Sequence, residues 1–301
     1  MVFVKIVFGS SENMKEIMSS LVHLVVTSPP YYNAPFDFPN LFSSYDEFLK
    51  LLKNVGRELL RVLLPGRYMC FVTQDVRIEG KLYPIVSDLI HIMVYEVGFE
   101  YQEKIIWRKP EGYIRISRRS GVLVQHPYPM YYYPDNIYEE IVVFKKPGEF
   151  DRASILEHIK EKSRIDVNRF QAEKWYLSVW DIKNVLPLEK WSKYTAAFPE
   201  ELVERLIRLY SYWGEIVLDP FLGTGTTCVV AKKLGRNCIG YEIDLELMDV
   251  IKERLGVDIK MLFQQDSIEI IVRNDAKRLR TVLRKEIEKK LKNKNRNGDH
   301  L

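Results

Sequence analysis

The chain has only three cysteines among 301 residues, and Cys70, Cys228 and Cys238 form no Cys-x-x-Cys pair. We therefore expect neither a structural zinc site nor a disulfide framework, and we predict no metal site. No run of about 18 apolar residues is present, which excludes a transmembrane helix. The first residues are too few and have the wrong charge order for a signal peptide. We expect a cytoplasmic protein with no membrane partner.

The excess of positive over negative charge is small, at a net charge of +4, but it is unevenly distributed along the chain. Residues 274–296 hold ten Lys and Arg against three acidic residues, so the rest of the chain is net negative. A basic segment of this kind favours a polyanionic partner, although a solvated terminal helix gives the same composition. Hydrophobic residues make up 47% of the chain, which is enough to bury a core and excludes a wholly disordered protein.

Apolar periodicity alternates between strand and helix along most of the chain. It predicts strands over 2–8, 21–27, 68–73, 99–108, 141–145, 215–218 and 237–241. It predicts helices over 10–20, 45–64, 82–97, 199–213, 226–234 and 245–255. Residues 146–192 interrupt this rhythm with charge and tryptophan. Alternating βα units predict an α/β fold with a doubly wound, mostly parallel sheet.

One chemical signal is the segment 219–227, Asp-Pro-Phe-Leu-Gly-Thr-Gly-Thr-Thr, between a predicted strand and a predicted helix. Gly223 and Gly225 allow a tight turn, and the helix that follows presents free N–H groups to a ligand. Glu242 lies 23 residues beyond Asp219, close to the spacing of about 20 at which an acidic residue holds a ribose. The G-x-G-x-x-G pattern is incomplete and no G-x-x-x-x-G-K-[ST] loop is present. A nucleoside cofactor without a pyrophosphate is therefore favoured over NAD or ATP.

The other signal is the segment 27–33, Thr-Ser-Pro-Pro-Tyr-Tyr-Asn, at the end of an apolar run. Its two prolines lack N–H donors and leave carbonyl acceptors in a rigid loop. Ser28 adds a hydroxyl and Tyr31 adds a flat ring, which suits a planar substrate that carries an amino group. Taken alone, the same residues would also fit a rigid turn without chemistry. Ligands of doubly wound sheets bind at the carboxyl ends of strands, where both segments are expected.

With 27–33 first in the chain and 219–227 later, the two segments resemble motifs of the amino-group DNA methyltransferases that use S-adenosylmethionine. Their order resembles the permuted arrangement called the β class. The resemblance covers about residues 1–256 and implies a circularly permuted, Rossmann-like methyltransferase fold with a small specificity insert. Further segments that resemble the family are Leu-Leu-Pro-Gly at 63–66, the 138–146 strand, Val-Trp-Asp-Ile at 179–182 and Ala-Phe-Pro-Glu-Glu-Leu at 197–202.

Three positions depart from the family pattern. Thr224 stands where serine is usual, and Arg67 replaces a second glycine. Gly9 is followed by Ser10, whereas the family usually has aspartate there. Asp266 is a hypothetical substitute for that acid, and the alternative is that Asp266 is a solvent-facing loop residue.

The resemblance implies S-adenosylmethionine as the cofactor. The implied cofactor-binding residues are Asp219, Phe221, Gly223, Gly225, Thr226 and Glu242, with Phe198 and Pro199. The implied catalytic residues are Ser28, Pro29, Pro30 and Tyr31. We expect the Ser28 hydroxyl and the Pro29 carbonyl to accept the two N–H bonds of the target amine, while Tyr31 stacks on the base. A base inside a duplex cannot reach such a loop, so we expect it to be flipped out.

By resemblance, Ser28 before the two prolines favours the N4 amine of cytosine, and adenine N6 is the alternative target. We expect a site-specific DNA methyltransferase from a restriction–modification system, acting as a monomer or a homodimer on double-stranded DNA beside a cognate endonuclease. A nucleic-acid-binding homologue that has lost catalysis is an alternative from another class. Methylation of RNA is a third reading, against which Ser28 argues.

Four segments divide the chain by role. Residues 1–147 form the target-base half, 148–192 the target-recognition insert, 193–262 the cofactor half and 263–301 a basic tail. Basic residues interleaved with aromatics over 104–136 suit phosphate contact and stacking, although a hairpin with its tyrosines packed on the sheet is the alternative. The expected DNA-binding residues are Arg115, Arg118 and Arg119 in that region, with Lys162, Arg164 and Arg169 in the insert.

Overall fold

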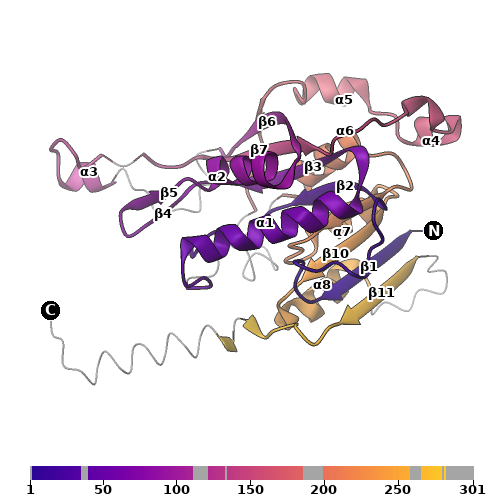
Figure 1. The fold of residues 1–301 in the computed structure, drawn as a ribbon. Helices are drawn as coiled ribbons and strands as arrows, with labels where there is room; N and C mark the ends of the chain where they lie inside the picture. The colour runs from indigo at the N-terminus through magenta and orange to yellow at the C-terminus, as the bar shows by residue number, and fades with distance from the viewer. Residues whose placement is uncertain are drawn as a thin grey trace.

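The computed structural model describes residues 2–34, 40–110, 121–132, 134–185, 199–257, 266–279 and 281–282. These residues fold around a nine-stranded sheet in the order β11-β1-β10-β9-β2-β3-β7-β6-β8 (Figure 1). The strands are β1 (Phe3–Phe8), β2 (Val22–Thr27), β3 (Leu63–Thr73), β6 (Glu100–Arg108), β7 (Tyr138–Lys145), β8 (Val179–Asp181), β9 (Ile216–Asp219), β10 (Asn237–Glu242) and β11 (Ser267–Val272). A separate hairpin is formed by β4 (Val76–Ile78) and β5 (Lys81–Tyr83).

Strand direction defines two edges of the large sheet. Only β7 runs antiparallel to its neighbours, β3 and β6, among the described pairings of this sheet. Thr73 lies opposite Glu140 and Arg108 lies opposite Tyr138, so β7 begins at the edge where the parallel strands end. We call this the carboxyl edge. The expected α/β fold with a mostly parallel sheet is confirmed.

Helices cover both faces of the sheet. They are α1 (Tyr45–Val62), α2 (Ile85–His91), the π-helical η1 (Ile92–Val97), α3 (Gly121–Gln125), η3 (Arg152–Ser154), α4 (Glu157–Lys162), α5 (Val167–Ala172), α6 (Glu200–Tyr210), α7 (Thr226–Lys233), η4 (Leu245–Leu247) and α8 (Met248–Leu255). One face packs against α1 and α2 through Phe48 and Leu89, and the other against α6 and α8 through Leu206 and Ile251. None of the helices in the described ranges combines the length and apolar composition that crossing a bilayer requires.

Helix α1 illustrates how local sequence determines where a helix begins and which of its faces is buried. The Ser44 side chain caps its first turn by accepting the Glu47 N–H, and Asp46 and Glu47 place negative charge beside the helix N-terminus. Phe48 and Leu52, four residues apart, lie on its buried face. The hydroxyl and amide of Ser43 both donate to Glu47, and they lower the pKa of that carboxyl.

The predicted helix over 10–20 is wrong, because this segment is a chain of turns. Side chains of α1 take the backbone groups that a helix would have used. Arg61 donates to the carbonyl oxygens of Met14 and Ile17, at 3.0 and 2.9 Å, and Glu58 accepts the Met14 N–H at 2.7 Å. The apolar spacing that indicated a helix reflects the burial of Met14 and Ile17 against α1.

Strand β11 was not predicted, and it lies within the segment assigned to a basic tail. It pairs in parallel with β1 along its whole length, with Phe3 opposite Ser267 and Phe8 opposite Val272. As an edge strand it is only partly buried, so its sequence lacks the apolar run that marks a central strand. The sheet therefore extends beyond residue 262.

The expectation drawn from cysteine spacing also needs correction. Cys228 of α7 and Cys238 of β10 form a disulfide, and both residues are buried. Sequence separation did not indicate this pairing, because it depends on α7 packing directly onto the strand that follows it. Cys70 is free and buried in β3.

Candidate functional site

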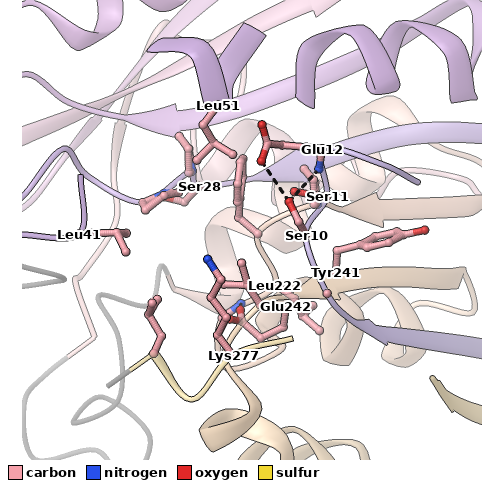
Figure 2. A pocket seen from close by; sticks show the side chains of 18 of the residues that line it. Ser10, Ser11, Glu12, Ser28, Leu41, Leu51, Leu222, Tyr241, Glu242 and Lys277 are labelled. Atoms are coloured by element: carbon pink, nitrogen blue, oxygen red, sulfur yellow. Dashed lines mark hydrogen bonds between the residues drawn. The ribbon is translucent and has the colours of Figure 1, made fainter. Parts of the chain in front are cut away.

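A cavity of about 410 Å³ opens at the carboxyl edge of the sheet, within the size range of small-molecule sites. Loops after β1, β2, β9 and β10 meet there, together with α1 and the segment after β11 (Figure 2). The residues discussed below that line it are Ser10, Glu12, Ser28, Pro29, Pro30, Tyr31, Phe221, Gly223, Thr224, Thr226, Glu242, Ile243, Lys277 and Leu279. Both sequence motifs therefore contribute to one cavity.

Asp219 joins the two motifs from beneath the cavity. Its Oδ1 accepts the Thr27 hydroxyl at 2.7 Å and its Oδ2 accepts the Thr227 hydroxyl at 2.7 Å. The Phe221 N–H adds a third bond at 3.0 Å. Burial raises the pKa of Asp219 to about 6, although these three hydrogen bonds favour its charged form. Asp219 is not among the cavity-lining residues, so its geometry fits a link between β2 and β9 better than direct contact with a ligand.

The glycine loop after β9 brings backbone amides to the cavity wall. Gly223 and Gly225 have φ of +56° and +87°, in the left-handed region that favours glycine. The Gly223 N–H donates to Glu242 Oε2 at 2.8 Å, and the Asp244 N–H donates to Oε1 at 2.8 Å. These two backbone N–H groups orient the Glu242 carboxylate, which lines the cavity. Gly225 itself caps α7 and does not line the cavity.

The structure also shows what lies near Ser10, where the family usually has aspartate. The Ser10 N–H donates to Asp275 Oδ2 at 3.1 Å, and Asp275 pairs with Arg273 at 2.9 Å. Asp275 thus supplies a carboxylate to this loop, although it does not line the cavity. Asp266, the substitute considered from sequence, lies at the other end of β11 and accepts the Val2 N–H at 2.9 Å. The hypothesis for Asp266 is therefore wrong.

Sequence analysis missed a set of lining residues that follow β11. The Lys277 N–H donates to the Ile243 carbonyl at 2.8 Å, and the Lys277 carbonyl accepts the Leu245 N–H at 2.8 Å. These bonds hold the segment against the turn after Glu242. Lys277 extends into the cavity (Figure 2), and Leu279 also lines it. Only the pairing of β11 with β1 brings these residues here, so no local sequence signal could have identified them.

Tyr31 lines the cavity, but its hydroxyl points away from it into a buried polar cluster. The hydroxyl donates to Glu139 Oε2 at 2.5 Å. The other oxygen of Glu139 forms an ion pair with Lys109, whose ammonium also lies 4.8 Å from the centre of the Trp107 ring. Glu139 is the second residue of β7 and Lys109 follows β6, so both reach Tyr31 from the carboxyl edge.

Of the remaining residues predicted to bind the cofactor, some line the cavity and others do not. Thr226 and Phe221 line the cavity, whereas Pro199 is the residue before α6 and does not. The prediction for Phe198 falls outside the residues that the structure describes. The predictions for Arg115, Arg118 and Arg119 fall outside them too.

Basic residues of the predicted recognition insert lie at the edge opposite the cavity. β7 ends with Lys145 beside Tyr68, near the start of β3, and the insert continues from that edge. The Ser163 hydroxyl accepts the Trp213 N–H at 2.7 Å, just before β9 begins. In Figure 1, α4 and the carboxyl-edge helix α3 accordingly lie at opposite ends of the molecule. The structure therefore does not bring Lys162 and Arg164 to the site.

Arg169 is engaged in contacts within the protein. Its guanidinium pairs with Glu204 of α6 at 2.7 Å and with Glu173 at 2.8 Å. These contacts raise its pKa above the ordinary value for arginine. Arg169 thus links α5 to α6 through its ion pair with Glu204. It does not line the cavity.

The connection between β6 and β7 leaves the sheet at the carboxyl edge. The Lys109 N–H donates to the Ile137 carbonyl at 2.7 Å and closes its base. We call residues 121–132, the described part of this connection away from its base, the arm. Tyr128 and Tyr132 are 66% and 67% exposed, so the alternative in which these tyrosines pack on the sheet is wrong for both.

Comparison with known proteins identifies the family. The model of the N6/N4 DNA methylases matches residues 22–253. The Type II methyltransferase M.MjaI of Methanocaldococcus jannaschii is 34% identical, over 89% of this chain and 96% of its own length. The Type II methyltransferase M.MthZI of Methanothermobacter thermautotrophicus is 32% identical, over 89% of this chain and 79% of its own length.

Solved structures agree with this assignment. A DNA modification methylase of Thermus thermophilus, complexed with S-adenosyl-L-methionine, is 29% identical, with a TM-score of 0.68 over 89% of this chain and 98% of that one. The PvuII DNA methyltransferase, at 16% identity and a TM-score of 0.60, shares the fold over 89% of this chain and 96% of its own. The cavity also suits a nucleoside cofactor, since it combines a carboxylate, a glycine loop and apolar walls. The chain belongs to the N6/N4 DNA methylase family, and its cofactor is S-adenosylmethionine.

Proposed function

We propose that this DNA methyltransferase transfers a methyl group to the N4 amine of a cytosine in double-stranded DNA, within a restriction–modification system. The observation that carries the proposal is that Ser28, Pro29 and Pro30 line the same cavity as Gly223 and Glu242. The Type II relatives from the two methanogens support the modification role. Serine before the two prolines supports cytosine, because the common adenine-N6 form of the motif has aspartate there. Target motif before cofactor motif supports the permuted β class.

In this proposal the loop after β2 activates the amine. An exocyclic amine is a poor nucleophile, because its lone pair is delocalised into the ring of the base. The Ser28 hydroxyl and the Pro29 carbonyl accept its two N–H bonds, which favours a more tetrahedral nitrogen and its developing positive charge. Tyr31 stacks on the flipped-out base and fixes its plane. When bound, S-adenosylmethionine supplies an electrophilic methyl group on sulfur, so alignment provides much of the catalysis.

Residues of the second motif hold the cofactor. Glu242 accepts the ribose hydroxyl groups, since its carboxylate lines the cavity and is oriented by the N–H groups of Gly223 and Asp244. Phe221, Thr226 and Gly223 form the wall beside the ligand. Asp219 acts indirectly, because its bonds to Thr27 and Phe221 set the distance between the two motifs.

The DNA is proposed to lie against the carboxyl edge, with the arm beside it. Only this edge gives a flipped base access to Ser28, because the cavity opens there. The exposed tyrosines of the arm, Tyr128, Tyr131 and Tyr132, offer rings for stacking on bases. Lys162 and Arg164, at the opposite edge, have no part in this proposal.

Methyl transfer from labelled S-adenosylmethionine tests the proposal directly. Purified protein is incubated with duplex genomic DNA or with tRNA, and each product is digested to nucleosides and identified by mass. We expect label in 4-methylcytosine from DNA and none in tRNA. Ser28→Ala should lower incorporation strongly while the affinity for cofactor stays near that of the wild type. Label in 6-methyladenine would move the target to adenine, and cofactor binding without labelled DNA would overturn the proposed activity.

A further inference from the structure

Three polar side chains near the target loop are almost fully buried and contact one another. Tyr31, Glu139 and Lys109 are 4%, 6% and 7% exposed. Each oxygen of the Glu139 carboxylate has its own partner, since Oε2 accepts the Tyr31 hydroxyl at 2.5 Å and Oε1 pairs with the Lys109 ammonium. The cluster therefore connects the loop after β2 to the start of β7 and to the residue that follows β6.

Stability alone does not account for such a cluster. Burial removes the hydration of both charges, and a buried ion pair is often no more stabilising than apolar side chains of similar volume. The ion pair instead fixes the orientation of the side chains that it contacts. Lys109 compensates the charge of Glu139, and Glu139 fixes the hydroxyl end of Tyr31 through a charge-assisted hydrogen bond. Anchoring the hydroxyl fixes where the ring lies, and because a phenol O–H prefers the plane of its ring, the direction of the hydrogen bond also biases that plane.

We propose that Glu139 is a positioning residue for methyl transfer, which acts through Tyr31 and is itself held in place by Lys109. This inference rests on the proposed stacking of Tyr31 against the target base. The hydrogen bond to the Glu139 side chain also polarises the phenol and makes the face of the ring more negative. Such a face favours the positive charge that develops on the amine nitrogen during transfer.

The position of the cluster adds a connection to DNA binding. Lys109 closes the base of the β6–β7 connection through its bond to Ile137, and Glu139 lies two residues further on. The same ion pair thus fixes both Tyr31 and the base from which the arm extends.

Four variants test this role: Tyr31→Phe, Glu139→Gln, the double variant of both, and Glu140→Gln as a matched control. Glu140 is the next residue of β7 and pairs with Lys104 at 3.1 Å, away from Tyr31. The measurements are the rate of methyl transfer at saturating DNA and cofactor, the affinity for cofactor, and the thermal midpoint of unfolding. Tyr31→Phe and Glu139→Gln should each lower the rate by about tenfold, because a displaced ring misaligns the base. The cofactor affinity should change less than about twofold in every variant.

Coupling distinguishes positioning from a merely structural role. If Glu139 acts through Tyr31, the double variant should lie within about twofold of the slower single variant. Losses that multiply in the double variant would overturn the proposal, and so would single variants with the wild-type rate. Glu140→Gln should keep the wild-type rate, and a loss equal to that of Glu139→Gln would contradict a specific role.

A second pair of changes covers the case in which Glu139→Gln alone does not fold. Lys109→Met combined with Glu139→Gln removes both buried charges and leaves no unpaired one. It should fold and show the same loss of rate, whereas the wild-type rate in a folded protein would overturn the proposal. Wild-type protein that binds cofactor but methylates no DNA would instead refute the proposed function, a result distinct from every variant outcome.

Discussion

Thr27, the last residue of β2, donates a hydrogen bond of 2.7 Å to the carboxylate of Asp219, the last residue of β9. The two residues are 192 positions apart in the chain, yet each is the first residue of one of the two motifs that contribute to the cavity. The bond therefore sets the separation of the target loop from the cofactor loop. It also satisfies one of the acceptors of a carboxylate that is almost fully buried.

Replacing Thr27 with valine keeps its shape and removes this bond. We expect Thr27→Val to lower the free energy of unfolding by about 1–2 kcal/mol, because the buried Asp219 carboxylate loses one of its hydrogen bonds and Oδ1 keeps only the bond from the Phe221 N–H. The rate of methyl transfer should fall with it, since Ser28 is the adjacent residue. Chemical denaturation and single-turnover kinetics measure the two effects. Thr27→Ser retains the hydroxyl and serves as the control, and equal losses in both variants would contradict a role for the bond.

The raised pKa of Asp219 predicts how the free energy of unfolding depends on pH. Burial raises that pKa to about 6 from the ordinary 3.8, so the native state binds a proton more tightly than the unfolded chain. The stability that this carboxyl contributes is present at low pH and is lost as the pH rises through this window. Relative to Asp219→Asn, the wild type should lose about 2–3 kcal/mol of unfolding free energy between pH 4 and pH 7. Denaturation curves of both proteins across this range test it, and a constant difference would refute the assigned pKa.

Placement of the DNA gives a third prediction. Changing both Tyr131 and Tyr132 to alanine should weaken binding of duplex DNA by tenfold or more, at about 1–3 kcal/mol for each lost stacking contact. Changing Lys162 and Arg164 to alanine should leave both the affinity and its salt dependence near wild type, because they lie at the opposite edge. Fluorescence anisotropy at two salt concentrations measures both. If DNA affinity depended less on salt in the Lys162 and Arg164 variant, the insert would be shown to contact the DNA backbone.

Local sequence signals predicted the central elements well. The run that became β2 and the segment around Asp219 were identified because a buried strand and a glycine loop have patterns of their own. Arg67 stood out only as a departure from the family, yet in the structure it forms a buried ion pair with Glu215 and its guanidinium lies 4.3 Å from the centre of the Phe150 ring. These partners come from distant segments, so the sequence could not reveal them.

The failures have the same physical origin. Residues 10–20 follow helical spacing, but Arg61 and Glu58 of α1 bind the backbone groups that a helix needs. The recognition insert was assigned by family resemblance, and its basic residues were expected to contact DNA; the assignment of the insert stays a prediction. Charge does not tell which edge of a sheet a segment leaves, and the antiparallel direction of β7 decides that. Likewise, Cys228 and Cys238 meet only because α7 packs on β10.

The last prediction concerns the segment after β11 and its contacts with the cavity loops. Arg273 donates to the Asn13 carbonyl at 2.6 Å, and Asp275 accepts the Ser10 N–H, so this segment holds one rim of the cavity. Lys277 binds the opposite rim through Ile243. Ending the chain at residue 272 should therefore weaken cofactor affinity by about tenfold or more, since both rims lose their support.

Ending the chain at residue 282 is the matched control for that deletion. It retains Arg273, Asp275 and Lys277 and removes most of the basic residues that follow. Cofactor affinity should stay at the wild-type value, while the salt dependence of DNA binding should decrease because fewer cations contact phosphate. Isothermal titration with S-adenosylmethionine and DNA binding at several salt concentrations separate the two effects. Equal cofactor affinity in both shortened chains would show that the loops after β1 and β10 hold their geometry without this segment.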